Sequence, residues 1–282
     1  MSINKLFFSK NGWIDKSKIL SSLLSVEADS CDILYIHSGL NFGIPNPELK
    51  REELINEILE VFIELNVRTL CMPNFTFSFC NNLNFDLDRS RSKMGAINEY
   101  FRTQSNAKRS LDPLMSVSIM GDDSDLIENL GNESIGHNST FEKLSKKDNV
   151  KFLFFGTALH DCFTYMHYLE YVAKSKYRYN REFKGLITAN GITEESTYVL
   201  FIRYNNVRPN VQTTIEYGDI LKHRKNLKSG VLGNSYVSCV DEISAKNLYL
   251  EIIEKNPNYF ILGDFDIKSA DTTFIANNMV AL

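Results

Sequence analysis

Three side chains suited to acid–base chemistry stand at regular intervals in one segment of the chain. Thr164, His167 and Glu170 are three residues apart and follow an apolar run. On a helix, residues at this spacing are surface neighbours, so His167 can contact Thr164 one turn back and Glu170 one turn on. Glu170 would bind one ring nitrogen and orient the other. The pattern indicates a general-base site, because an oriented imidazole accepts a proton near neutral pH.

Other interpretations of this segment stay open. A helical histidine with a glutamate three residues away is often a surface ion pair, and a threonine at a helix start often caps its own first turn. Cys162 stands two residues before Thr164. A covalent route through Cys162 and a hydrolase with Cys162 or Ser110 as nucleophile are therefore further candidates. We favour a base that acts without a covalent intermediate, because nothing nearby in sequence would clearly activate the Cys162 thiol.

The composition limits the class of protein. Of the 282 residues, 43% are hydrophobic and 23% are charged, and the formal net charge is −4. These values are typical of a globular protein and provide no basic field for nucleic acid. We therefore expect a small-molecule partner and no nucleic-acid partner.

Cysteine usage and hydropathy give two more expectations. The five cysteines are scattered and odd in number, without paired spacing, and the histidines form no ligand-spaced set with them. We expect reduced thiols in the cytoplasm and no metal site. No apolar stretch approaches the roughly 20 residues of a membrane span, so we expect no membrane partner.

Strand-like and helical patterns alternate through the first two thirds of the chain. Helices are predicted at 15–27, 50–65 and 123–130, and strands at 32–37, 69–73, 116–121 and 152–155. The alternation predicts an α/β fold, with a three-layer α/β/α core and a mixed central sheet. Polar segments follow three of the strands, and ligands collect at the carboxyl ends of such strands. We expect residues 37–38, 74–76 and 157–161 to line one crevice.

The later part of the chain has a different pattern. Two β-like runs, 177–187 and 196–204, flank the pair Asn190-Gly191, which is a strong hairpin signal. We expect a β-rich portion at about 177–240, followed by a helix at 244–254 and a strand at 259–262. No linker is evident, so we expect a single domain over 1–282.

Five segments, in order, resemble the aminoglycoside 3-N-acetyltransferase family. They are His37-Ser38-Gly39-Leu40, Met72-Pro73-Asn74-Phe75-Thr76, residues 95–102, residues 109–116 and the element of Thr164, His167 and Glu170. The similarity runs from about residue 14 to residue 262. The chain departs from the family pattern at Gly39, Asp112, Phe163 and Ser139-Thr140, and we expect these changes to affect the substrate more than the fold.

The resemblance implies the fold of that family and transfer of an acyl group from coenzyme A to a primary amine. Acetyl-CoA or another acyl-CoA is the implied co-substrate. His167 would accept the amine's proton, with Glu170 as its orienting partner. Thr164 would either donate to the oxyanion or hold the imidazole.

The resemblance also implies a course for the cofactor along the crevice. Backbone N–H groups would bind pantetheine and diphosphate, and Arg109 with Ser110 would bind a phosphate. The residues expected to bind the cofactor are His37, Ser38, Gly39, Leu40, Asn74, Phe75, Thr76, Arg109 and Ser110. Those expected at the amine substrate are Glu99, Asp161, Arg178 and Arg203. Simpler alternatives are a solvated Arg109 and a structural His37.

The acceptor is the remaining question. Members of the family acylate aminoglycosides or nucleotide-linked amino sugars, some of them for surface polysaccharide. A polycationic aminoglycoside favours an acidic pocket, whereas a nucleotide-linked sugar favours cations and aromatic rings. The segment after the catalytic helix is basic and aromatic, with Lys174, Lys176, Tyr177, Arg178, Tyr179, Arg181, Lys184, Arg203, Tyr204 and Arg208.

We therefore expect a nucleotide-linked amino sugar. An aminoglycoside acetyltransferase conferring resistance is the first alternative. A solvated hairpin would also explain the lysines, and a non-catalytic acyl-CoA-binding protein is the candidate from another class. A homodimer is kept open as the assembly state.

Overall fold

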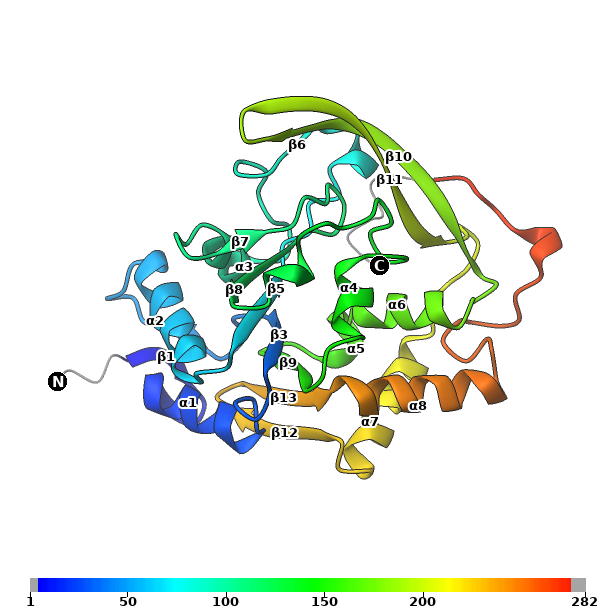
Figure 1. Cartoon of the computed structure of the whole chain (residues 1–282). Helices are drawn as coiled ribbons and strands as arrows, with labels where there is room; N and C mark the ends of the chain where they lie inside the picture. Colours follow the sequence, from blue (N-terminus) through cyan, green and yellow to red (C-terminus); the bar gives the residue numbers. More distant parts are fainter. Residues whose placement is uncertain (1–4, 275–282) are drawn as a thin grey trace.

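A seven-stranded mixed sheet forms the centre of the structure, a computed structural model that describes residues 5–274 (Figure 1). The strand order is β12-β13-β9-β3-β5-β8-β7. The three middle strands, β9 (Val150–Phe155), β3 (Ile33–Ser38) and β5 (Thr69–Pro73), pair in parallel. The remaining pairs are antiparallel, and they involve β12 (Leu227–Leu232), β13 (Ser235–Asp241), β8 (Val117–Gly121) and β7 (Lys108–Arg109). The predicted mixed sheet is confirmed.

The sheet is the middle of three layers because its strands are apolar on both faces. Along β3, Ile33 and Tyr35 belong to one hydrophobic cluster, whereas Leu34 and Ile36 belong to another. The cluster of Leu34 and Ile36 includes buried residues of α1 (Lys16–Ser25), α2 (Arg51–Glu64) and α3 (Ala96–Arg102). The other cluster includes residues of α4 (Thr140–Leu144), α6 (Tyr165–Val172), α7 (Val211–His223) and α8 (Glu242–Lys255). The predicted α/β/α core is confirmed.

A long hairpin arches over one end of the sheet (Figure 1). Its strands are β10 (Arg178–Ala189) and β11 (Ile192–Arg203), and they pair without a break in register. The turn residues Asn190 and Gly191 have φ values of 51° and 77°, as a two-residue hairpin turn requires. The short strand β6 (Phe85–Asp86) pairs with β10 and ties the irregular segment before α3 to the hairpin.

The β-rich portion expected at about 177–240 also contains a helix. Helix α7 lies between the hairpin and β12, and the pair β12–β13 extends the central sheet instead of forming a separate lobe. The single-domain organisation stays a prediction. None of the helices in residues 5–274 combines the length and apolar character needed to cross a membrane.

Two of the predicted elements are wrong. The helix expected at 123–130 is one 3-10 turn, η2 (Ser124–Leu126). The strand expected at 259–262 is a turn with a single bridge between Ile261 and Pro209. Phe260 stacks on Tyr249 at 5.0 Å between ring centroids, so the apolar residues of that run pack against a helix instead of joining a sheet.

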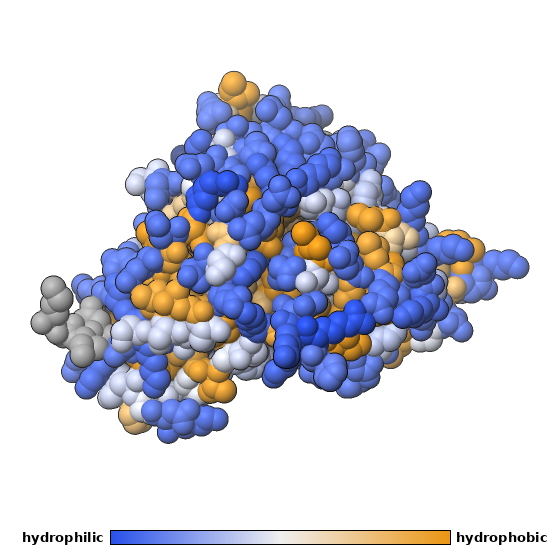
Figure 2. Space-filling model, turned by 60° about the horizontal axis from the view of Figure 1, so that its bottom comes forward, coloured by the Kyte–Doolittle hydropathy of each residue, from blue (hydrophilic) through white to orange (hydrophobic). Residues whose placement is uncertain are grey.

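Several short elements had no clear sequence signal. They are β1 (Lys5–Ser9), β2 (Gly12–Asp15), β4 (Ile44–Pro45), η1 (Phe79–Asn81), α5 (Leu159–Cys162) and η3 (Ile267–Ser269). The first three form a small sheet of their own, in the order β2-β1-β4. Figure 2 shows one face of the molecule, on which hydrophobic patches are separated by hydrophilic surface. Scattered patches of this kind are normal on a protein surface, and the homodimer stays a prediction.

Candidate active site

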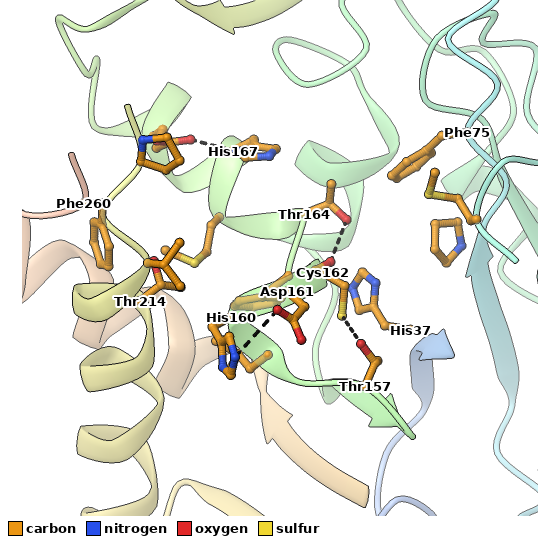
Figure 3. A pocket seen from close by; sticks show the side chains of 18 of the residues that line it. His37, Phe75, Thr157, His160, Asp161, Cys162, Thr164, His167, Thr214 and Phe260 are labelled. Atoms are coloured by element: carbon orange, nitrogen blue, oxygen red, sulfur yellow. Dashed lines mark hydrogen bonds and ion pairs between the residues drawn. The ribbon is translucent and has the colours of Figure 1, made fainter. Parts of the chain in front are cut away.

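A cavity of about 410 Å³ opens at the carboxyl ends of β3, β5 and β9 (Figure 3). His37 and Ser38 at the end of β3, Phe75 after β5 and Thr157 after β9 all line it. Parallel strands end at the same edge of a sheet, which is why residues far apart in sequence meet here. Of the residues expected to line one crevice at these strand ends, all but Asn74, Thr76 and Ala158 line this cavity.

The Thr164, His167 and Glu170 element forms the start and one face of α6. His167 and Glu170 are buried and both line the cavity. Nδ1 of His167 lies 2.9 Å from Oε2 of Glu170 (Figure 3). The predicted contact between the two side chains is therefore present, and it is buried instead of being a surface ion pair.

Glu170 is held as a carboxylate by two further groups. The Tyr177 hydroxyl donates to Oε1 at 3.0 Å, and Nη2 of Arg178 lies 2.7 Å from Oε2. Burial alone would raise the pKa of Glu170, but Arg178 and His167 outweigh it, and the pKa falls to about 2. Glu170 is thus ionised at physiological pH.

His167 is neutral at physiological pH. Burial lowers its pKa to about 4, and Arg178 adds to this effect while Glu170 opposes it. A neutral imidazole keeps a lone pair on one ring nitrogen. The ring can therefore accept a proton from a group bound in the cavity.

Thr164 lines the cavity but faces away from the imidazole. Its hydroxyl donates to the carbonyl of Cys162 at 3.3 Å (Figure 3). It makes no side-chain capping bond to α6, so the capping alternative is not what the structure contains. An oxyanion role for Thr164 would require its hydroxyl to turn from Cys162 to the substrate.

The Cys162 thiol is not activated. It donates to the carbonyl of Ala158 at 3.2 Å and contacts the Thr157 hydroxyl at 3.6 Å. Burial raises its pKa to about 12, so it stays protonated and is a poor nucleophile. This argues against an acyl-enzyme or hydrolase route through Cys162.

His37 lies deeper in the same cavity. Its ring stacks on Phe154 at 5.4 Å, with an angle of 5° between the rings. Burial lowers its pKa to about 3, and its Nε2 has no hydrogen-bond partner within residues 5–274. His37 is therefore a neutral, fixed ring beside the cavity. Next to it, the Ser38 hydroxyl lines the cavity and donates to Oδ1 of Asn98 at 2.6 Å.

Three of the backbone N–H groups expected to bind the cofactor, those of Gly39, Asn74 and Thr76, are already bonded within the protein, which corrects the expectation for these three. Gly39 donates to Phe155 O at 2.7 Å, and a Cβ at Gly39 would lie 2.7 Å from Gly156 O. Glycine is thus needed at position 39 because the chain passes close to Gly156 there. Neither Gly39 nor Leu40 lines the cavity.

The second expected segment is similar. The N–H of Asn74 donates to Ser116 O at 2.7 Å and that of Thr76 donates to Leu114 O at 3.3 Å. Both residues are buried away from the cavity, and of this segment Phe75 reaches it.

Arg109 and Ser110 lie outside the cavity, contrary to their expected role at a phosphate. The guanidinium of Arg109 donates to the carbonyls of Leu87, Ser90 and Asn74 at 3.1, 2.6 and 2.9 Å. The Ser110 hydroxyl is buried and accepts from Val117 N–H at 2.9 Å. These donors and acceptors are used within the protein, so Arg109 fastens the irregular segment before α3.

The four residues expected at the amine separate into two groups. Asp161, Arg178 and Arg203 line the cavity. Glu99 is outside it, and Arg102 binds both of its carboxylate oxygens at 2.8 and 2.7 Å. Glu99 is therefore corrected to a structural partner of Arg102.

The departures from the family pattern have local structural roles. The Asp112 carboxylate accepts from the N–H groups of Leu114 and Met115 at 2.8 and 2.9 Å. Phe163 packs on Phe152 at 5.0 Å and lines the cavity. Ser139 caps α4 by accepting from Glu142 N–H.

Sequence reasoning missed one wall of the cavity. Thr214 of α7 and Phe260 close the side opposite Phe75 (Figure 3), and Val211 of α7 also lines the cavity. Helix α7 was not predicted, and residues in it carry no chemical signature. Arrangement of the chain in space, and not local sequence, brings them to the site.

Comparison with known families agrees with this architecture. A family model described as Aminoglycoside 3-N-acetyltransferase matches residues 69–251. The chain belongs to this family. The match includes the segment of Thr164, His167 and Glu170 but begins after the strand that ends at His37. The enzyme class expected from sequence, an N-acyltransferase, is thereby confirmed.

Solved structures of aminoglycoside acetyltransferases share the fold. AAC(3)-Xa matches with a TM-score of 0.72 and 15% identity, over 86% of this chain and 93% of that chain. A structure described as AAC-IIIb binary with CoASH matches at 0.70 and 15%, over 89% and 98%. AAC-VIa bound to sisomicin matches at 0.71 and 19%, over 85% and 97%. No curated protein matches the chain.

Proposed function

We propose that this family member transfers an acetyl or other short acyl group from coenzyme A to the primary amine of an amino sugar. A nucleotide-linked amino sugar destined for surface polysaccharide is the acceptor we favour. The observation that carries the proposal is the buried pair of His167 and Glu170 in the wall of the cavity. Such a pair is suited to removing a proton from a nucleophile.

The low pKa of His167 limits when it can act. An imidazole whose pKa is about 4 is too weak a base to deprotonate a resting alkylammonium group. The fraction of the amine that has lost its ammonium proton to solvent would attack the thioester carbonyl, and its nitrogen becomes far more acidic as the C–N bond forms. His167 would accept that nitrogen's proton during or after attack, and Glu170 would stabilise the imidazolium that forms. The C–S bond would then break, and the leaving thiolate of coenzyme A would take the proton from the imidazolium.

The cavity walls suit a thioester. Phe75, Phe77, Met94, Phe163 and Met166 provide apolar surface, which favours the pantetheine arm and a short acyl group and excludes water. Ser38, Thr157 and His37 are the polar groups on the same side. These side chains would hold the donor, because the backbone N–H groups of Gly39, Asn74 and Thr76 are bonded within the protein.

Charge supports an acceptor with few amines. Among the described residues, the carboxylates that line the cavity are Asp161 and Glu170, and Glu170 is paired with Arg178. Arg203 adds one positive charge, which balances Asp161. An aminoglycoside carries several ammonium groups and would meet no net negative charge here, whereas the diphosphate of a sugar nucleotide would meet no net repulsion.

Two alternatives are weighed against this proposal. Acylation of an aminoglycoside is favoured by the similarity to AAC-VIa bound to sisomicin and by the exposed carboxylate of Asp161 at the cavity. An acyl-CoA-binding protein without turnover is disfavoured by the intact pair of His167 and Glu170.

Release of free thiol from acetyl-CoA tests the proposal. The panels are dTDP- and UDP-linked amino sugars and aminoglycosides, with reactions lacking an acceptor and reactions with longer acyl-CoAs as controls. Release with a sugar nucleotide supports the proposal, and release only with aminoglycosides replaces it by the first alternative. Release without an acceptor indicates a hydrolase. Binding of acyl-CoA without release in any reaction supports the binding protein.

A further inference from the structure

The first residue of β10 places a guanidinium directly behind the proposed base. The Arg178 side chain is 1% exposed, and its Nη2 lies 2.7 Å from Oε2 of Glu170 and 2.8 Å from Nδ1 of His167. Its Nη1 donates to the carbonyl of Phe201 on β11 at 2.9 Å. The base of the hairpin thus holds Arg178 against both members of the pair.

The two contacts at Nδ1 require opposite tautomers of His167. An ionised Glu170 only accepts, so its contact requires a proton on Nδ1. Arg178 only donates, so its contact would require a lone pair there. A guanidinium binds a carboxylate more strongly than it binds a neutral acceptor. We therefore assign the Nη2 N–H that faces the pair to Oε2 of Glu170, which leaves a proton on Nδ1 and the lone pair on Nε2.

We propose that Arg178 is a positioning residue that fixes the tautomer and the neutral state of His167 through Glu170, and is not a ligand of the amine substrate. This inference rests on the proposed function, because it gives His167 the role of base. It replaces the substrate contact that the sequence predicts for Arg178. The proposal stands on the shared Nη2 contact and on the burial of all three side chains.

The other charged and titratable groups around the pair are few. Arg203 of β11 stands opposite Arg178 in the hairpin register and also lowers the pKa of His167. The Tyr177 hydroxyl donates to Glu170. Tyr249 of α8 faces the same carboxylate, and burial raises its pKa well above its usual range. Both tyrosines are neutral at physiological pH, so Arg178 is the positive charge in direct contact with His167.

Removal of Arg178 should raise the pKa of His167. Without its positive charge, protonated His167 is stabilised by Glu170 alone, so the pKa of His167 rises. A base works only when it is unprotonated, and its activity falls as the pH drops through its pKa. The acid limb of kcat/KM therefore moves to higher pH in a variant that lacks the guanidinium.

The test compares Arg178→Met and Arg178→Lys with Arg181→Met. Arg181 lies on the same strand, contacts Thr272 O at 2.9 Å and does not line the cavity, so it is a matched control for loss of a hairpin arginine. The readout is ¹⁵N NMR of the imidazole of His167, assigned by its absence in His167→Gln. In wild type and Arg181→Met we expect the neutral form with Nδ1–H between about pH 5 and pH 8. In Arg178→Met we expect the midpoint to rise by at least about one pH unit.

The kinetic measurement separates positioning from substrate binding. We expect Arg178→Met to lower kcat with little change in the KM of the amine and to shift the acid limb by the same amount as the NMR midpoint. An unchanged titration of His167 together with a raised amine KM would overturn the proposal and return Arg178 to the substrate. If Arg178→Met does not fold, Arg178→Lys takes its place, and the same comparison of kcat with the KM of the amine tests the proposal. The NMR titration needs no acceptor, so it distinguishes failure of this inference from failure of the proposed function.

Discussion

Nδ1 of His167 lies 2.9 Å from Oε2 of Glu170, with both side chains at most 10% exposed. The contact joins two residues three apart on α6, and it orients the imidazole at the edge of the cavity. Because Glu170 is ionised, it stabilises the charge that His167 would gain on accepting a proton. The relationship is therefore the structural basis of the proposed base catalysis.

Glu170→Gln should lower kcat by about a hundredfold or more, the usual contribution of a working acid–base group. The amide keeps the size of the side chain but removes the negative charge that stabilises imidazolium. Steady-state kinetics would measure the change, with Glu182→Gln on the exposed part of the hairpin as a control. A kcat equal to that of wild type would show that the charge of Glu170 has no catalytic role.

Stability should fall below neutral pH because two histidines are buried in the neutral form. The folded pKa values of His37 and His167 are about 3 and about 4, below the usual value near 6.5 of an unfolded chain. The unfolded state therefore binds more protons as the pH falls from about 6.5 towards 4. Each histidine should cost about 2 kcal/mol of unfolding free energy at pH 5.

Urea denaturation at pH 7 and pH 5 would measure this loss. His37→Phe removes one of the two groups and can keep the stacking on Phe154, so its stability should fall less over the same interval. Equal losses in wild type and His37→Phe would show that His37 does not stay neutral in the folded protein.

Gly39→Ala should destabilise the protein by about 1–3 kcal/mol, the typical cost of overpacking. The new Cβ would lie 2.7 Å from Gly156 O, and backbone cannot move aside easily. Gly218→Ala is the matched control. Gly218 lies in α7, and a Cβ added there would meet no atom of another element within 4 Å. Alanine also favours a helix more than glycine does. Thermal melts of both variants would compare them, and equal melting temperatures would contradict the close approach at Gly39.

Arg109→Met should lower stability and leave the KM of acyl-CoA unchanged in the folded fraction. The substitution leaves the carbonyls of Leu87 and Ser90 without this donor, whereas that of Asn74 keeps the Ser116 hydroxyl at 2.7 Å. It also removes the guanidinium from the ring of Phe85, which it faces at 4.9 Å. We expect a loss of about 2–4 kcal/mol, since each unsatisfied buried group costs on the order of 1–3 kcal/mol. A raised KM with unchanged stability would instead return Arg109 to the cofactor.

Much of the fold could be predicted because the signals are local. The strand Thr69–Pro73 ends at its proline, as predicted, and the hairpin turns at Asn190 and Gly191. Helix α2 buries apolar residues at helical spacing. The pair of His167 and Glu170 was predictable for the same reason, since its geometry depends on one helical turn.

The rest of the site depends on partners distant in sequence. From the local sequence Arg109 resembles a phosphate ligand, but its guanidinium donates to the carbonyls of Leu87, Ser90 and Asn74. Gly39 suggests a cofactor approach, whereas its close neighbour is Gly156. No local pattern predicts such contacts. Sequence alone therefore identifies side chains that could bind a ligand, but not the protein groups to which those side chains are already bonded.

The most direct test of the proposed chemistry is the rate of acyl transfer by His167→Ala. We expect kcat to fall by on the order of a hundredfold or more, while acyl-CoA binding and the folded structure are retained, because His167 lines the cavity without supporting the sheet. The measurement is thiol release with the best acceptor, alongside acyl-CoA titration and circular dichroism of both proteins. Equal rates for His167→Ala and wild type would contradict the role of His167 as the base.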